Sequence, residues 1–154
     1  SDAILRIEIP DASALTPLAH AIGAALDAAD RAGAERACQA LVDALNAQLA
    51  TPPVKVRVLE RRPANAEGEL QGLYEPDEVT GGTARISVWM RTAQRVQVVK
   101  FRTFLRTLVH EICHHFLGID PIKDWIPVRP APTAATTASV TSRCSRQRFG
   151  MLPP

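Results

Sequence analysis

The residues best suited to chemistry are His110, Glu111 and His114, which lie in the segment HEICH and follow the pattern HExxH. Side chains four residues apart lie on one face of a helix, so His110 and His114 can present two imidazoles to one metal ion. Glu111 lies about 100° round the helix from His110, close enough to hold a metal-bound water without being a ligand. The spacing predicts a zinc site in which Glu111 acts as general base on a water that attacks a carbonyl.

The segment around this motif predicts a helix from about Val98 to Leu117, with Gly118 as its stop. At about 100° per residue, His110 and His114 share the face opposite an apolar stripe. The stripe is formed by Phe101, Phe104, Leu105, Leu108, Val109, Ile112 and Phe116. With 4 His and 8 Glu in 154 residues, HExxH should arise by chance in roughly half a percent of such chains. We therefore expect a helix whose polar side lines a metal-binding cleft.

The elements that must position this helix are three strands and an Ala-rich helical stretch. Alternating apolar residues predict strands, and Thr16-Pro17 predicts the start of a helical stretch that ends before Thr51-Pro52-Pro53. Gly33 either divides this stretch into two helices or weakens one. The strands are expected at 4–9, 54–60, 70–74 and 84–90, the third being the shortest. The pattern indicates an α+β fold: a small twisted mixed sheet with a backing helix and the HExxH helix.

The segment TLVHEICHHF resembles the active-site helix of the zincin metallopeptidases, and the order of elements in residues 1–120 is similar to the upper part of that fold. The resemblance implies zinc-dependent hydrolysis of peptide bonds in a peptide or protein substrate. His110 and His114 would be zinc ligands and Glu111 the catalytic base. In that family the strand before the active-site helix often forms the sheet edge that binds substrate. By resemblance, strand 84–90 would take that role.

Catalytic zinc usually has three protein ligands, and the zincin subfamilies differ in the third. A gluzincin-like Glu is excluded, because no Glu follows Glu111. The metzincin pattern HExxHxxGxxH, with Asp in the last place in some members, is similar to HEICHHFLGID and implies Asp120 as third ligand. The glycine, Gly118, stands one position later than in that pattern. Asp124 is the other carboxylate nearby. His115 is expected to be a hydrogen-bonded neighbour rather than a ligand, and Cys113 a small buried side chain.

Residues 121–154 differ in character from the rest of the chain. Pro, Ala, Thr and Ser make up half of this tail, which we expect to be flexible or truncated. It carries five basic residues and one acidic residue, whereas residues 1–120 carry 13 and 15. The basic excess therefore belongs to the tail, and nucleic-acid binding by residues 1–120 is not expected.

Other features of the sequence bear on location and partners. Three widely spaced cysteines argue against a disulfide scaffold and favour a cytoplasmic location, and the sequence has no apolar run long enough for a membrane span. The alternative to a peptidase is a non-catalytic zincin-like module that binds zinc or a protein partner. A regulatory or toxin-associated module that recognises a protein through its sheet edge is a further alternative.

Overall fold

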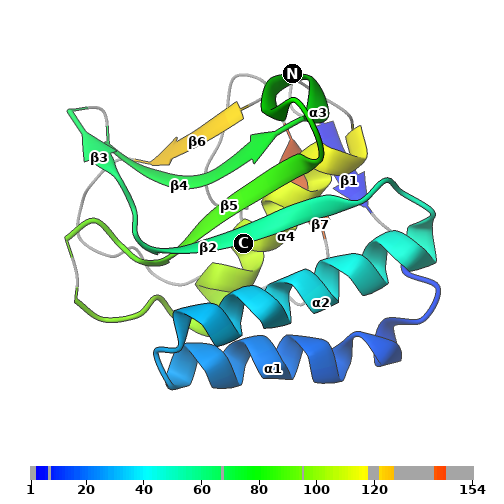
Figure 1. Ribbon diagram of the computed structural model, residues 1–154, viewed down its shortest axis with the longest axis horizontal. Helices are drawn as coiled ribbons and strands as arrows, with labels where there is room; N and C mark the ends of the chain where they lie inside the picture. The colour runs from blue at the N-terminus through cyan, green and yellow to red at the C-terminus, as the bar shows by residue number, and fades with distance from the viewer. Residues whose placement is uncertain are drawn as a thin grey trace.

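The computed structural model describes the backbone of residues 3–6, 8–66, 68–94, 96–117, 122–126 and 141–144, and the side chains of 8–66, 68–94 and 96–117. These residues form an α+β fold in which a curled mixed sheet carries helices on one face (Figure 1). The α+β prediction is confirmed.

The Ala-rich stretch forms two helices, α1 (Thr16–Asp27) and α2 (Arg31–Leu49), preceded by a short 3-10 turn at Ala12–Ala14. The break lies at Ala28–Asp30, before Gly33. Ala29 adopts a left-handed backbone conformation (φ 52°), and the Asp30 side chain caps α2 by accepting from the Gly33 backbone N–H at 2.9 Å. Gly33 therefore lies in the first turn of α2, and the capping aspartate marks where the second helix begins.

The main sheet has β5 (Ala84–Arg91) in its interior. β5 pairs in parallel with β2 (Val54–Arg61) and antiparallel with β4 (Gly68–Glu75), and a short helix, α3 (Asp77–Thr80), joins β4 to β5. The prediction that strand 84–90 is the substrate-binding edge is therefore wrong. Its side chains are almost all buried because β5 is flanked by a strand on each side.

The outer edge of β4 is occupied by two further strands. β3 (Ala64–Asn65) forms a hairpin with the start of β4, and β6 (Ile122–Ile126) pairs antiparallel along most of its length. Another tail strand, β7 (Thr141–Cys144), pairs antiparallel with β1 (Ala3–Arg6) in a separate two-stranded sheet. The sequence indicated no strands in this tail. Its Pro-, Ala- and Thr-rich segment 130–139 lies outside the described residues.

The outer edge of β2 is covered by side chains of α2. Gln39 accepts from the Val56 N–H at 2.8 Å and donates to the Val54 carbonyl at 2.9 Å. Glu35 accepts from the Val58 N–H at 3.0 Å, and Arg31 donates to the Val58 carbonyl at 2.8 Å. Side-chain groups thus take the place of a neighbouring strand.

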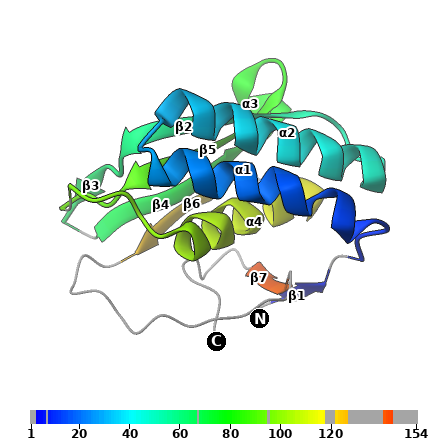
Figure 2. The ribbon, with the colours of Figure 1, turned by 90° about the horizontal axis from the view of Figure 1, so that it is seen from below.

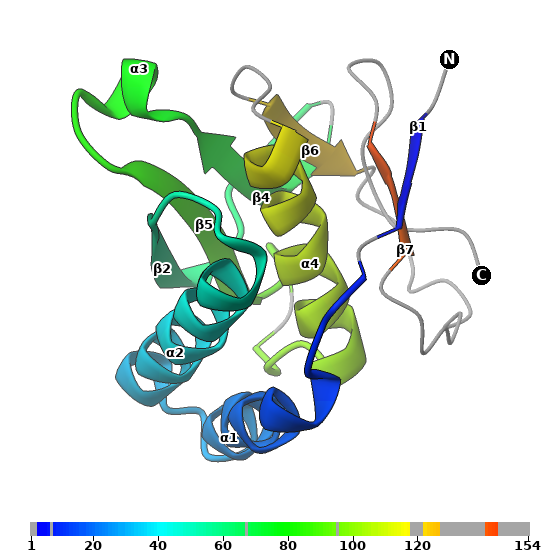
Figure 3. The same ribbon diagram turned by 90° about the vertical axis from the view of Figure 1, so that its right-hand side faces the viewer.

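The predicted HExxH helix is α4 (Phe101–Leu117), which packs on β4 and β5 (Figures 2 and 3). α1 and α2 cover the same face of the sheet, and the β1–β7 ribbon lies beside α4 on its other side (Figure 3). The core between helices and sheet is contiguous. Its largest fully buried apolar side chains include Ile22, Ile86, Met90, Phe104, Leu108 and Ile112.

Candidate metal centre

Helix α4 places the motif inside the molecule. Phe104, Leu108 and Ile112 repeat every four residues and bury one side of the helix in the core. The polar side is buried as well: His110 is 4% exposed, and Glu111 and His114 are 0% exposed. The sequence predicted that this side lines a cleft, whereas the structure encloses the three side chains.

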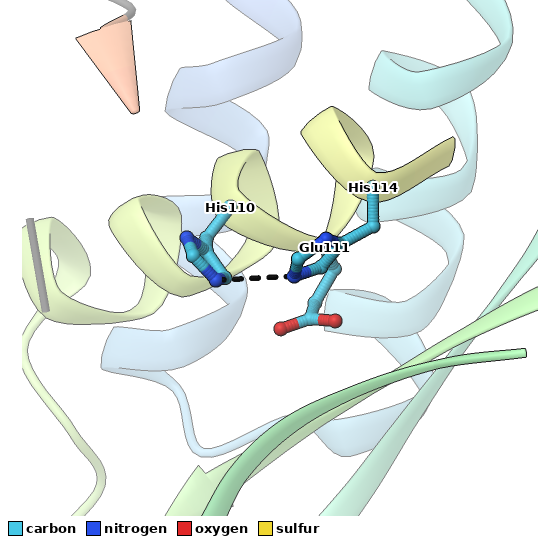
Figure 4. A group of neighbouring side chains, drawn as sticks. All are labelled: His110, Glu111 and His114. Carbon is cyan, nitrogen blue, oxygen red and sulfur yellow. Dashed lines mark hydrogen bonds between the residues drawn. The ribbon is translucent and has the colours of Figure 1, made fainter. Parts of the chain in front are cut away.

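The two imidazoles of the motif face each other across one helical turn (Figure 4). Their Nε2 atoms lie 3.2 Å apart, and the rings meet edge to face with centroids 4.7 Å apart. Two nitrogens at zinc-bonding distance in a tetrahedral site would be about 3.3 Å apart. A single N–H···N hydrogen bond also fits this distance. The position of Glu111 therefore decides what the pair can do.

The carboxylate of Glu111 completes the cluster. The ligand atoms of His110, Glu111 and His114 all lie within 4.8 Å of one another, so the group could hold a metal ion. Figure 4 shows the carboxylate beside the two rings, on the side that faces the sheet. Burying a carboxylate away from water is costly unless positive charge or hydrogen bonds compensate it. A divalent cation among these groups would provide that compensation.

Gly72 on β4 makes room for this carboxylate. A Cβ atom at position 72 would lie 2.5 Å from Glu111 Oε2 and 2.9 Å from Cδ, closer than any side chain tolerates. A residue other than glycine would therefore displace Glu111. The HExxH motif contains no signal for this contact, because Gly72 is 39 positions earlier in the chain.

A β-bulge directs two successive residues of β4 toward α4. The pairing with β6 shifts between Leu70 and Gly72, which leaves Gln71 as the extra residue. Gln71 donates to the Thr107 hydroxyl at 2.9 Å, and Thr107 donates to the Thr103 carbonyl at 3.1 Å. Thr107 lies one turn before Glu111 on α4. The bulge thus fixes the helix to the strand next to the cluster.

His115 joins α4 to two other segments. Its Nε2 lies 2.8 Å from the Pro52 carbonyl oxygen, which can only accept, so Nε2 carries the proton. Nδ1 then accepts from the Tyr74 hydroxyl at 3.1 Å. With both ring nitrogens used, His115 is a hydrogen-bonded neighbour, as predicted. Burial, together with the nearby Asp77 and Glu78, raises the pKa of Tyr74 to about 12, so the phenol stays a donor.

The remaining predicted residues are placed as follows. Cys113 is fully buried, as expected. Asp120 lies outside the described residues. Asp124 belongs to β6, where its Cα pairs with that of Gly72. In the acidic cluster, Glu75 forms an ion pair with Arg85 at 2.9 Å, while Asp77 and Glu78 lie in the first turn of α3 and are exposed.

Comparisons of the chain with known protein families, curated protein sequences and solved structures find no match. Within the described residues, none of the helices is long and apolar enough to cross a membrane. The geometry around α4 is therefore what a functional proposal must rest on.

Proposed function

We propose that this chain is a zinc-dependent peptidase of zincin type, in which His110 and His114 bind the metal and Glu111 is the general base. One observation carries the proposal. Two Nε2 atoms stand at the separation of two tetrahedral zinc ligands, and a buried carboxylate lies within 4.8 Å of both rings. The α+β architecture, with the motif helix packed on a mixed sheet, agrees with this assignment.

The donor set favours zinc among the common metals. Imidazole nitrogen suits Zn²⁺, Cu²⁺, Fe²⁺ and Ni²⁺, whereas Ca²⁺ and Mg²⁺ prefer sites made of oxygen ligands. His110 and His114 would bind through the Nε2 atoms that face each other, so each Nδ1 would keep its proton and act as a donor. The sequence pattern offers Asp120 as the third ligand.

Zinc bound at this site would lower the pKa of a coordinated water to about 7 and polarise a substrate carbonyl. Glu111 orients the attacking water and accepts its proton at a carboxylate oxygen. The same carboxyl group then donates that proton to the nitrogen of the leaving amine. Because Glu111 is enclosed, its interactions with neighbouring charges are stronger than at a surface. The substrate would be a peptide or a protein. The buried free thiol of Cys38 supports the further proposal of a reducing, cytoplasmic location.

Two observations favour a second candidate, a non-catalytic zincin-like module that holds zinc as a structural ion or binds a protein partner. The cluster is 0–4% exposed. Both edges of the described sheet are also occupied, by β6 on one side and by α2 side chains on the other. In this case a metal would connect α4 to its surroundings without turning over substrate.

The test combines metal content with hydrolysis. The full chain, purified without chelators, should contain about one zinc per molecule by elemental analysis, and a His110→Ala/His114→Ala double variant should contain none. Glu111→Gln should keep the metal but lose at least about 100-fold in the rate of cleavage of a quenched fluorescent peptide library. Zinc in the parent without any cleavage would select the non-catalytic module. Absence of zinc from the parent, even after dialysis against ZnCl₂, would refute both candidates.

A further inference from the structure

The described cluster contains two imidazoles and one carboxylate, and the proposed chemistry assigns that carboxylate to the base. Catalytic zinc usually has three protein ligands and one open position. A third ligand must therefore come from a residue outside the HExxH motif. The inference that follows rests on the proposed function and concerns the identity of that residue.

Strand β6 brings an acidic residue to the position opposite the cluster. Asp124 pairs with Gly72, and the Cβ position of Gly72 lies 2.5 Å from Glu111 Oε2. In an antiparallel pair, opposite residues lie on the same face of the sheet with Cβ positions about 5 Å apart. Since position 72 faces α4, the register places Asp124 on the sheet face that carries the cluster.

The bulge at Gln71 is what creates this register. Glu69 pairs with Ile126 and Leu70 with Trp125, so a regular ladder would continue by pairing Gln71 with Asp124 and Gly72 with Lys123. The extra residue on β4 shifts the pairing by one, and Gly72 pairs with Asp124 instead. The bulge therefore places a carboxylate residue, and not a lysine, opposite the one residue that contacts Glu111.

We propose that Asp124, carried by β6, is the third zinc ligand of this site, in preference to Asp120. The metal would then join helix α4 to the outermost strand of the sheet. Binding of zinc would stabilise the pairing of β6 with β4, in addition to the backbone hydrogen bonds. The tail segment 122–126 thereby belongs to the metal site.

The test uses the full chain and Zn²⁺ alone, with affinities measured by chelator competition. Asp124→Asn removes the charge at nearly constant volume and should weaken zinc binding by at least about 100-fold. The matched variants Asp120→Asn and Lys123→Gln should change it by less than about threefold. Circular dichroism and melting in EDTA should show that all three variants fold like the parent.

A second variant gives a positive signal. Asp124→Cys places a thiolate, itself a zinc ligand, at the same position and should restore tight binding. Loaded with Co²⁺, it should show a thiolate-to-metal charge-transfer band that Asp120→Cys lacks. In hydrogen exchange, zinc should protect the amides of residues 122–126 in the parent and not in Asp124→Asn.

The outcomes separate this inference from the function on which it rests. A parent that binds no zinc refutes the proposed function. A parent that binds zinc tightly, with Asp120→Asn and not Asp124→Asn weakening it, overturns the assignment to Asp124 and leaves the metal site in place. Tight binding in both asparagine variants also overturns it, because the site would then take no carboxylate ligand from this segment.

Discussion

Glu111 occupies the volume in which any residue other than glycine at position 72 would place its Cβ. The position of the proposed base therefore depends on an atom that is missing from a strand 39 residues earlier in the chain. A motif search finds the functional group and does not find the residue that makes room for it.

Gly72→Ala tests this dependence. The added Cβ would lie 2.5 Å from Oε2 and 2.9 Å from Cδ of Glu111, so the carboxylate must move. We expect a loss of about 1–3 kcal/mol in the free energy of unfolding, measured in urea with EDTA, and weaker zinc binding by the folded variant. Gly82→Ala is the control, because nothing lies within 4 Å of its Cβ position. Equal effects of the two substitutions would contradict the steric argument.

Burial of Cys38 gives a second prediction at the scale of single residues. Desolvation, together with nearby Glu35, raises the pKa of the Cys38 thiol from 9.0 to about 12. The folded protein thus holds this proton more tightly than the unfolded chain does. The resulting stability is complete below about pH 9 and is lost as the pH rises toward 12. In urea unfolding between pH 8 and 11, Cys38→Ala should show a shallower alkaline loss of stability than the parent. An unchanged slope would argue against the shift.

At the scale of elements, His115 connects three segments: α4, β4 through Tyr74, and the α2–β2 connection through Pro52. His115→Gln should lower the free energy of unfolding by about 1–3 kcal/mol, because it disturbs two buried hydrogen bonds. Zinc stoichiometry should stay the same, because His115 is not a ligand. His20→Gln, at an exposed position on α1, should change stability by less than about 0.5 kcal/mol. Loss of zinc from the His115 variant would show that the assignment of His115 is wrong.

Much of the element order was predictable from local patterns. Alternation of apolar residues located β2, β4 and β5 within one or two residues, and the helical period located α4. These signals are local, because each strand or helix must bury one of its own faces. The cluster was predictable for the same reason, since His110, Glu111 and His114 all lie on one helix.

What the sequence could not indicate depends on pairing between distant segments. The interior position of β5 follows from partners on both sides, which a single strand does not encode. The closeness of Gly72 to Glu111 and of Tyr74 to His115 requires the register of β4 on α4. The bulge at Gln71 sets the register between β4 and β6, and nothing in the sequence of β4 marks it.

For the whole molecule, zinc should act as a stabilising ligand if the cluster binds it. A ligand that binds only the folded state, present at about 100 times its Kd, adds about 2.7 kcal/mol to the free energy of unfolding. Thermal melting of the parent should therefore shift upward with ZnCl₂ and return after EDTA. The His110→Ala/His114→Ala variant should show no shift. A similar shift in that variant would mean that zinc binds elsewhere.

The side chains that cover β2 have a consequence for how copies of this protein meet. Amide and carbonyl groups at positions 54, 56 and 58 would otherwise form a template to which a strand of another molecule could add. Gln39→Leu should uncover part of it, producing concentration-dependent oligomers by size-exclusion chromatography and thioflavin-positive fibrils on prolonged incubation. Arg36→Gln, an exposed neighbour on α2, should stay monodisperse under the same conditions. Helix α2 would then protect the protein against self-assembly, a property unrelated to any chemistry at α4.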